Sequence, residues 1–438
     1  MVSFEELIAR WTLEAEAERL ATIARNWDYY EGRHRKTLRV ARDGVDDNIV
    51  VNFVRLAVDK TVSYLFGKEI FFQVGGEEPD PYTDYLEAVF QRNRKMTFLQ
   101  RLALSGAVAG HFFVQIQPDG EFPRLVILDP STVSILTNPD DIDQVIGFRV
   151  QWNSVDDDGR PAVRRVDIVQ DGQIWRVRSF LSVRGGRDPF RQIGEASWPY
   201  PFPPVVHGQN LPAPHQVYGM SDVEPLIPIQ DAINFVISNT RRIYRLHGHP
   251  KTIATGVNTR QPLNWGPDET LVLSNENAKV WNLEMQGDLS AGIELYKRLV
   301  EAWHEIARIP VVSVGRLESI GSLSGVALRI LYEPLLELVE VKRRTYGDAL
   351  IELAQRLLSI RFGGEPREWP VSIRWPELIP AGIEEKARTA LMLMQIGVSQ
   401  DTLLEMLGFN PEHEARRQRF RSEDIVDKML AAMERRDE

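Results

Sequence analysis

Apolar and polar positions follow a helical repeat in the first quarter of the chain. Apolar residues recur every three or four positions over residues 4–31, 52–66 and 81–110, among many charged side chains. This spacing places the apolar residues on one face of a helix, so it predicts three helices. Gly32 is suited to end the first helix, because glycine readily adopts the left-handed conformation found at helix ends, and Gly67 is expected to stop the second.

A two-residue alternation of apolar and polar positions comes next and predicts β-strands. The expected strands are residues 112–117, 124–128, 145–152, 163–170 and 173–181. Asp171-Gly172 between the last two predicts a tight hairpin, because such a turn requires positive φ angles. Helices and strands together predict the fold class α+β. Residues 196–221 hold six prolines, which forbid a continuous helix, and are expected to be a linker that closes this domain.

The helical repeat returns after Asp222 and extends to about His247-Gly248. Its expected apolar face consists of Ile229, Ile233, Val236, Ile237 and Tyr244. Residues 251–285 are typical of short strands and turns, and a further helix is expected over 290–308, ended by Pro310. This order predicts two antiparallel helices with a small β insert at their tip.

Residues 311–324 carry glycine and serine at frequent intervals and are expected to form a loop. A long helix is predicted from Gly325 to about Ile360. Pro334 lies inside it and removes a backbone hydrogen bond, which predicts a kink near Ile330. The remaining residues predict a separate helical unit with helices over 383–397, 400–407 and 412–435.

Composition narrows the function. The chain has 438 residues, no cysteine and a formal net charge of -10. The lack of cysteine excludes disulfides and thiolate sites and fits a reducing compartment. No signal peptide or membrane span is expected. A protein that grips DNA needs a basic face, so the acidic balance argues against tight DNA binding. It is compatible with a protein through which DNA must slide.

The search for catalytic motifs is mostly negative. Gly67-Lys68 is followed by Glu69 and lacks the earlier glycine of a phosphate-binding loop. Gly321 to Gly325 has the glycine spacing of a nucleophile elbow, but Leu323 occupies the nucleophile position. We therefore expect no enzymatic activity and no cofactor. The alternative is a capsid-associated hydrolase or nuclease that uses carboxylates, and a monomeric binding module is a second alternative.

Four stretches resemble the portal proteins of long-tailed double-stranded DNA phages. They are Tyr29-Tyr30-Glu31-Gly32-Arg33-His34 with residues 48–60 and 64–68, Ser221 to Ile227 leading into residues 231–234, Ser324 to Arg329, and Val398 to Leu404. Their order and spacing over most of the chain carry the resemblance. Arg329 departs from the pattern, where lysine is expected.

The resemblance implies a ring of twelve subunits at one capsid vertex of the virion, assembled in the host cytoplasm. Double-stranded DNA would pass through it during packaging and ejection. The expected partners are the terminase large subunit, head-completion (adaptor) proteins, and the major capsid and scaffold proteins, with no membrane. The implied parts are a wing (1–221), two stem helices (222–250 and 288–310), a clip (251–287), a tunnel loop (311–324), the long helix with the return to the wing (325–377) and a crown (378–438).

Candidate site residues follow from this division. The tunnel loop offers Leu317, Ile320, Leu323 and Val326 to DNA, with an ordinary core role as the alternative. Lys251, Arg260 and Lys279 are expected at the terminase interface of the clip. Arg241, Arg242 and Arg245 in the stem could line the channel, although solvated positions or ion pairs between subunits are favoured. Pro334 marks the helix kink.

Overall fold

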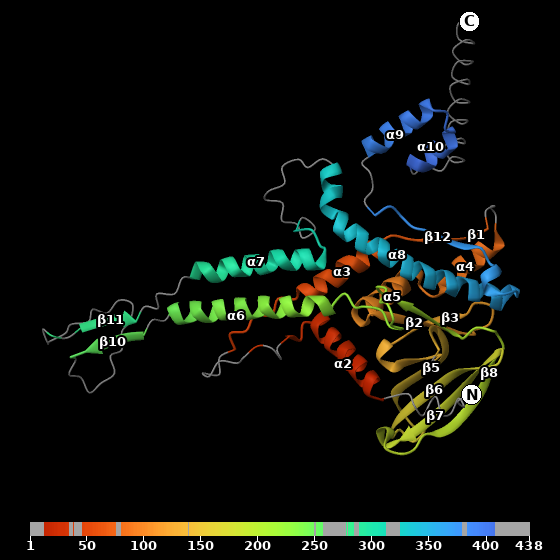
Figure 1. Ribbon diagram of the computed structural model, residues 1–438, viewed down its shortest axis with the longest axis horizontal. Helices are drawn as coiled ribbons and strands as arrows, with labels where there is room; N and C mark the ends of the chain where they lie inside the picture. Colours follow the sequence, from red (N-terminus) through yellow and green to blue (C-terminus); the bar gives the residue numbers. More distant parts are fainter. Residues whose placement is uncertain are drawn as a thin grey trace, which may run out of the picture. The chain divides into compact units, whose positions relative to one another are not determined.

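The computed structural model describes residues 13–34, 38, 46–75, 80–138, 140–248, 251–256, 277, 279–283, 289–311, 325–378 and 383–407 (Figure 1). The chain divides into two compact units. The first comprises residues 1–316 and 334–376, and the second comprises residues 317–333 and 377–438. Within the described ranges, no helix is long and apolar enough to cross a membrane.

Four helices belong to the body of the first unit. They are α2 (Leu13–Tyr30), α3 (Phe53–Phe66), α4 (Pro81–Arg92) and α5 (Lys95–Ala109). Each turns one apolar side inward, where Val58, Leu86 and Leu99 are completely buried. The helix expected over 52–66 is confirmed, and the one expected over 4–31 is confirmed in its described part.

The single helix expected over residues 81–110 is wrong, because the chain turns between α4 and α5. Asn93 ends α4, and its side-chain amide donates to the carbonyl oxygen of Val89 at 2.8 Å. Its Oδ1 accepts from the backbone N–H of Leu125 at 2.8 Å. Arg94 then adopts the left-handed conformation with a φ of 58°. Apolar residues continue at helical spacing through this turn, so the pattern alone could not locate it.

Three sheets complete the body. One is three-stranded and antiparallel in the order β3–β2–β9, one is an antiparallel meander in the order β4–β5–β6–β7–β8, and one pairs β1 with β12. The bounds are Phe71–Val74 for β1, His111–Gln117 for β2, Arg124–Leu128 for β3, Val133–Asn138 for β4, Asp141–Val155 for β5, Pro161–Asp171 for β6, Ile174–Val183 for β7, Arg191–Trp198 for β8, Val205–Gln209 for β9 and Val371–Arg374 for β12. The expected hairpin is confirmed, because Gly172 lies between β6 and β7 with a φ of 65°.

The linker expected over residues 196–221 is wrong in part, because this stretch holds the end of β8 and all of β9. β9 pairs with the central strand β2 from His111 to Gln115. Pro204 lies just before β9, so it does not remove a hydrogen bond from the ladder. Gly208 allows the ring of Phe112 to lie against the strand, since a Cβ there would be 2.2 Å from a ring atom.

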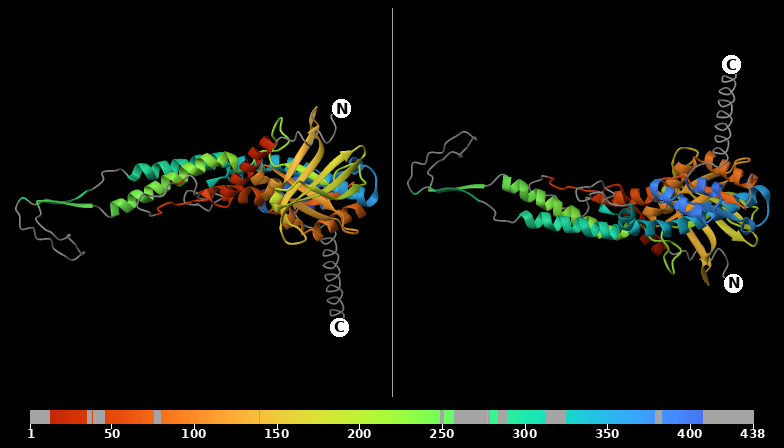
Figure 2. Two further views of the ribbon diagram at one scale, coloured as in Figure 1. Left: turned by 90° about the horizontal axis from the view of Figure 1, so that it is seen from below. Right: turned by 90° about the horizontal axis from the view of Figure 1, so that it is seen from above.

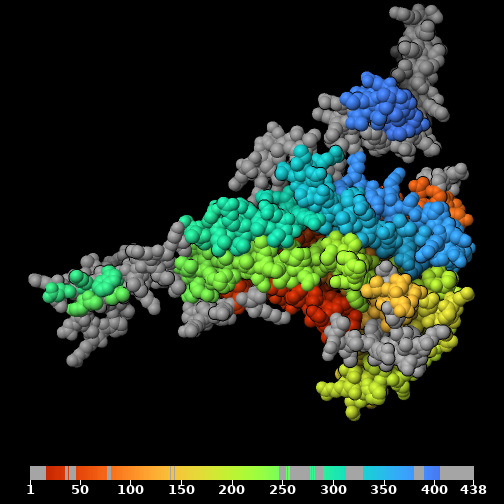
Figure 3. Space-filling model, in the orientation of Figure 1, coloured from red at the N-terminus to blue at the C-terminus, as the bar shows by residue number. Residues whose placement is uncertain are grey.

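Two long helices of the first unit, α6 (Ile227–Gly248) and α7 (Leu289–Ala307), lie side by side (Figures 1 and 2). Beyond their far ends, β10 (Lys251–Thr255) and β11 (Lys279–Leu283) form an antiparallel pair. The atoms of the two helices are in contact along most of their length (Figure 3). The expected order of helix, small β insert and helix is therefore confirmed.

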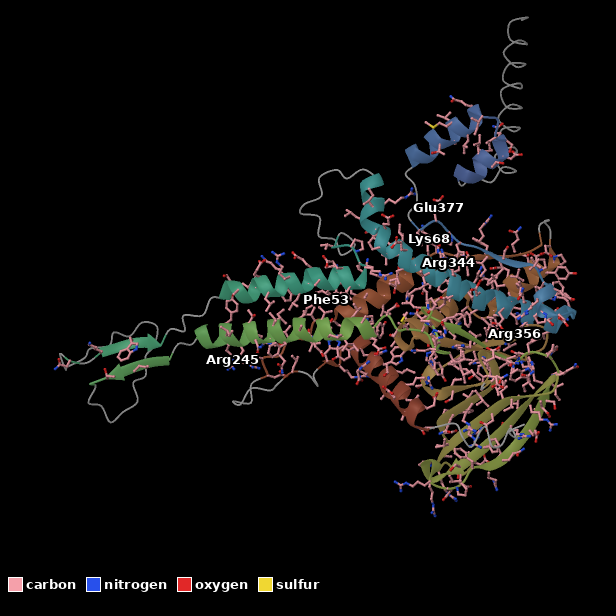
Figure 4. The ribbon with its side chains drawn as sticks, viewed as in Figure 1. Phe53, Lys68, Arg245, Arg344, Arg356 and Glu377 are labelled. Carbon is pink, nitrogen blue, oxygen red and sulfur yellow. The ribbon has the colours of Figure 1, made fainter. Side chains whose placement is uncertain are left out.

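α8 (Gly325–Phe362) has 38 residues and contains Pro334. From Pro334 onward it belongs to the first unit. There, Arg356 donates to the carbonyl oxygens of Pro203 and Val205 at 2.7 and 2.8 Å and so holds α8 against the start of β9 (Figure 4). The kink at Pro334 stays a prediction.

The second unit contains a helical hairpin of α9 (Ile383–Gln395) and α10 (Gln400–Leu407). Gly397 ends α9 with a φ of 91°, a conformation that suits glycine. The helices expected over 383–397 and 400–407 are confirmed, and the one expected over 412–435 lies outside the described residues.

Candidate functional site

The paired helices α6 and α7 are the parts of the chain expected to form the stem, and both are rooted in the body. The root is an apolar cluster to which α2, α3, α5, α6 and α7 all contribute. Trp303 of α7 is completely buried there, and its ring lies 5.1 Å from that of Phe53 on α3. Ile233 of α6 is also completely buried. The near ends of both helices are therefore fixed by ordinary core packing.

A second attachment uses polar groups. Residues 46–52, which we term the strap, run in extended form before α3 and contact α6. Gln230, Asn234 and Ser238 are all buried, and they repeat every four residues along one side of α6. Such spacing aligns three side chains on a helix. They form a row of hydrogen-bonding groups that faces the strap.

This row binds the backbone of the strap. Asn234 Oδ1 accepts from the N–H of Val51 at 2.9 Å, and Gln230 Nε2 donates to the carbonyl oxygen of Val51 at 2.7 Å. Ser238 Oγ accepts from the N–H of Ile49 at 2.9 Å. An extended segment outside a sheet must find partners for its peptide groups. The α6 side chains supply these partners, so they take the place that the backbone of a neighbouring strand would have in a sheet.

The aromatic stretch at the end of α2 completes this attachment. The Tyr29 hydroxyl donates to both carboxylate oxygens of Asp231, at 2.7 and 2.8 Å. Burial first, and then this carboxylate, raise the pKa of Tyr29. His34 Nδ1 lies 2.9 Å from the Asn234 amide nitrogen, and its Nε2 lies 2.7 Å from the carbonyl oxygen of Tyr29. Because Asn234 donates, Nδ1 accepts and Nε2 carries the proton.

The three stem arginines have different surroundings. Arg245 donates to the carboxylate of Asp47 at 2.8 and 2.7 Å, and Asp47 is only 2% exposed (Figure 4). This partner in the same chain was not among the alternatives considered for Arg245. Arg242 is half-buried, and its guanidinium group donates to Asn239 Oδ1 at 3.5 Å. Arg241 is exposed. Channel lining or pairing between subunits stays a prediction for these residues.

The other described candidates belong to other elements of the chain. Lys251 and Lys279 begin β10 and β11, and Lys279 is exposed opposite Thr255. Val326 lies in the first turn of α8. The candidates Arg260, Leu317, Ile320 and Leu323 lie outside the described residues. Among the described candidates of the first unit, the lysines belong to β10 and β11 and the arginines to α6.

α6 and α7 also carry large apolar side chains that are exposed. Phe235 and Tyr244 of α6 are 55% and 50% exposed, and they lie on opposite sides because nine residues make two and a half turns. Leu295 and Ile306 of α7 are 50% and 48% exposed on one side, with Ile293 on the other. Exposed apolar side chains therefore occur on more than one side of the helix pair.

The described residues offer little catalytic chemistry. No group of histidine and carboxylate side chains among them could hold a metal ion. The most strongly perturbed histidines, His111 and His207, are neutral. Burial is the main reason that the pKa of His111 lies well below its ordinary value and that the pKa of His207 is lowered to about 3. His111 of β2 and His207 of β9 pack against each other and against the ring of Tyr218.

Sequence reasoning missed the row on α6. It identified the apolar face that includes Ile233 but gave no role to the polar positions beside that face. The available signal was a repeat of Gln230, Asn234 and Ser238 at four-residue spacing beside that face. Their partners in the strap lie 179 to 189 positions earlier, so no local pattern could have paired them.

Comparison with known proteins places these features in context. The family model described as "Phage portal protein, SPP1 Gp6-like" matches residues 10–427. A solved structure titled as the neck of an empty GTA particle computed with C6 symmetry is 14% identical, with 86% of this chain and 94% of that chain covered and a TM-score of 0.49. The neck of the native GTA particle computed with C12 symmetry gives the same identity and coverage and a TM-score of 0.48. No curated protein matches the chain.

Proposed function

The chain belongs to the SPP1 Gp6-like family of phage portal proteins, and on this basis we propose that it forms the ring at one vertex of a phage-like capsid through which DNA is packaged and ejected. The observation that carries the proposal is the family match over residues 10–427. The match gives no support to a capsid-associated hydrolase or nuclease. The portal family is structural rather than enzymatic.

The exposed apolar residues of α6 and α7 support a ring. Phe235 and Tyr244 occupy opposite sides of one helix, so a single neighbour cannot cover both. Two different neighbours can, and this is the arrangement of a head-to-tail interface that closes into a ring. We propose twelve subunits, the number that the family resemblance implies.

Gel filtration with light scattering tests the ring. Twelve chains of 50.1 kDa give a particle of about 600 kDa. Phe235→Glu is expected to break the ring, because it places a charge in a contact between subunits. Ile174→Glu is the matched control, since Ile174 is an exposed apolar residue outside the helix pair and should leave the ring intact. A wild-type chain that stays monomeric at micromolar concentration would refute the proposal.

We also propose that the clip docks the terminase motor and later the head-completion proteins. Lys279 is exposed at the start of β11, and Arg260 belongs to the same insert. Lys279→Ala and Arg260→Ala should weaken terminase docking while the ring mass stays unchanged. The portal chain itself should hydrolyse no ATP, because it lacks a phosphate-binding loop. ATP hydrolysis by the pure ring would contradict this division of work.

DNA is proposed to pass the ring through weak, non-ionic contacts with the tunnel loop. The net charge of -10 and the apolar residues Leu317, Ile320 and Leu323 support this, because phosphate contacts by arginine would hold DNA in place. Leu323→Arg should slow translocation, more strongly at low salt. Leu323→Ala should change packaging efficiency but not ring mass. Packaging like wild type by both variants would refute the contact.

A further inference from the structure

A buried ion pair lies where the chain enters α6. The Asp222 carboxylate accepts from the ammonium group of Lys342 on α8, and the side chains of Lys342 and Asp222 are 2% and 7% exposed. Asp222 also accepts from Asn210 Nδ2 at 2.9 Å and from the Thr61 hydroxyl of α3 at 3.3 Å. The charge is therefore paired and hydrogen-bonded away from solvent.

Tyr346, one helical turn after Lys342, continues the network. Its hydroxyl donates to Asn210 Oδ1 at 3.0 Å, and its ring stacks on Phe112 at 4.5 Å. Burial first, and then Asp222, hold the pKa of Tyr346 well above its ordinary value, so the hydroxyl remains a donor. At Gly106 of α5, a Cβ would lie 2.1 Å from this hydroxyl. Only glycine allows α5 and α8 to approach this closely.

The backbone at Asp222 is fixed as well. Its N–H donates to the carbonyl oxygen of Ala107 at 2.9 Å. The neighbouring Ser221 hydroxyl lies 2.7 Å from the carbonyl oxygen of Val108. The end of α5 is thus bonded to the residues that lead into α6. α3, α5, α8 and the entry to α6 therefore meet at one buried polar cluster.

A buried ion pair contributes more to the specificity of one helix arrangement than to the free energy of folding. Taking two charges out of water costs free energy that their attraction only partly offsets, so apolar replacements of similar size can be equally stable. An apolar contact tolerates sliding and rotation, whereas a buried charge has one acceptable partner. A shift of α8 along its axis would leave Lys342 without Asp222.

We propose that Asp222 and Lys342 are positioning residues that lock α8 to the entry of α6, so that both helices move as one body while DNA passes. The proposal rests on the proposed portal function for its consequence. It assigns the transmission of force between the two helices to one charged contact. The clip and the tunnel loop, which those helices lead to along the chain, would then respond together.

The test compares single and double replacements. Lys342→Met leaves the Asp222 carboxylate buried without its cation, and amide exchange in α8 and α6 should accelerate on the order of 100-fold. Asp222→Asn with Lys342→Met removes both charges, while the amide oxygen at position 222 still accepts from Asn210 and Thr61, so this double variant should restore the thermal midpoint. In this double variant, exchange in α8 after Pro334 should remain faster than in wild type, and DNA packaging should stay reduced.

The control is a second buried lysine among the described residues, Lys95, which is 1% exposed and donates to the partly exposed Glu87 at 2.8 Å between α5 and α4. Lys95→Met with Glu87→Leu should leave packaging and α8 exchange at wild-type levels. If Lys342→Met does not fold, Lys342→Arg keeps the charge and should retain slow exchange. The proposal is overturned if the Asp222 and Lys342 double variant exchanges and packages like wild type. Exchange is measured on purified protein, so it tests the lock even if the chain forms no ring.

Discussion

Replacing Asn234 by leucine tests the attachment of α6 to the strap. Leucine has a similar size but cannot accept the hydrogen bond from the Val51 N–H, which is 2.9 Å long in the folded chain. It also removes the amide that donates to His34 Nδ1. A buried donor without an acceptor costs about 1–3 kcal/mol, and the lost bond to the imidazole adds about 1 kcal/mol. We expect the free energy of unfolding to fall by about 2–4 kcal/mol.

Hydrogen exchange followed by NMR or mass spectrometry reads this contact directly, because the Val51 amide is protected by a side chain. Loss of about 2 kcal/mol of local stability corresponds to about 30-fold faster exchange at Val51. Asn239→Leu is the control, since Asn239 is only half-buried on the same helix and should change stability by less than about 0.5 kcal/mol. Unchanged exchange at Val51 in Asn234→Leu would show that the strap is held by something else.

Three further predictions concern the root of the stem and the body. Trp303→Ala should lower the free energy of unfolding by about 3–5 kcal/mol in thermal melts, and the exposed Trp281→Ala should not; equal effects would contradict the role of the apolar cluster. Arg308 follows α7 with a φ of 57°. Arg308→Gly should raise the free energy of unfolding by about 1 kcal/mol, whereas Arg308→Ala should leave it unchanged. The free energy of unfolding should fall as pH drops below about 6.5. The pKa values of His111 and His207 are lowered in the folded chain, so only the unfolded chain binds protons in this range. The expected loss is up to about 2 kcal/mol per histidine between pH 7 and pH 5. A His207→Gln variant with the same pH profile as wild type would refute the contribution of that histidine.

Local pattern was sufficient where an element depends on its own periodicity. α3, the β6–β7 hairpin and the α6–α7 pair were all expected from apolar spacing or from a turn that needs positive φ. Local pattern failed where a distant contact decides. The break between α4 and α5 depends on Asn93 bonding to Leu125, and β9 exists because β2 offers it a partner despite the surrounding prolines.

The same distinction applies to the candidate site. Arg245 lies in a helix, α6, as expected, but its partner Asp47 lies 198 positions away, so the pair was not foreseeable. The apolar face of α6 was only partly interpreted. Ile233 is buried as expected, whereas Tyr244 is 50% exposed. The apolar spacing continues along α6 beyond the part of the helix that packs on the body, so the pattern alone does not show where burial ends.

The row of polar side chains on α6 has a consequence for how the chain folds. The bonds from Gln230, Asn234 and Ser238 to the strap join residues 179 to 189 positions apart. Contacts between such distant residues form late, because closing so long a loop is entropically costly. During synthesis the peptide groups of the strap therefore remain hydrogen-bonded to water until α6 has been made, which is after more than half of the chain. The orientation of α6 on the body would be fixed only after these bonds have formed. Its exposed apolar residues could not face a neighbouring subunit correctly before then, so subunits should fold first and associate afterwards.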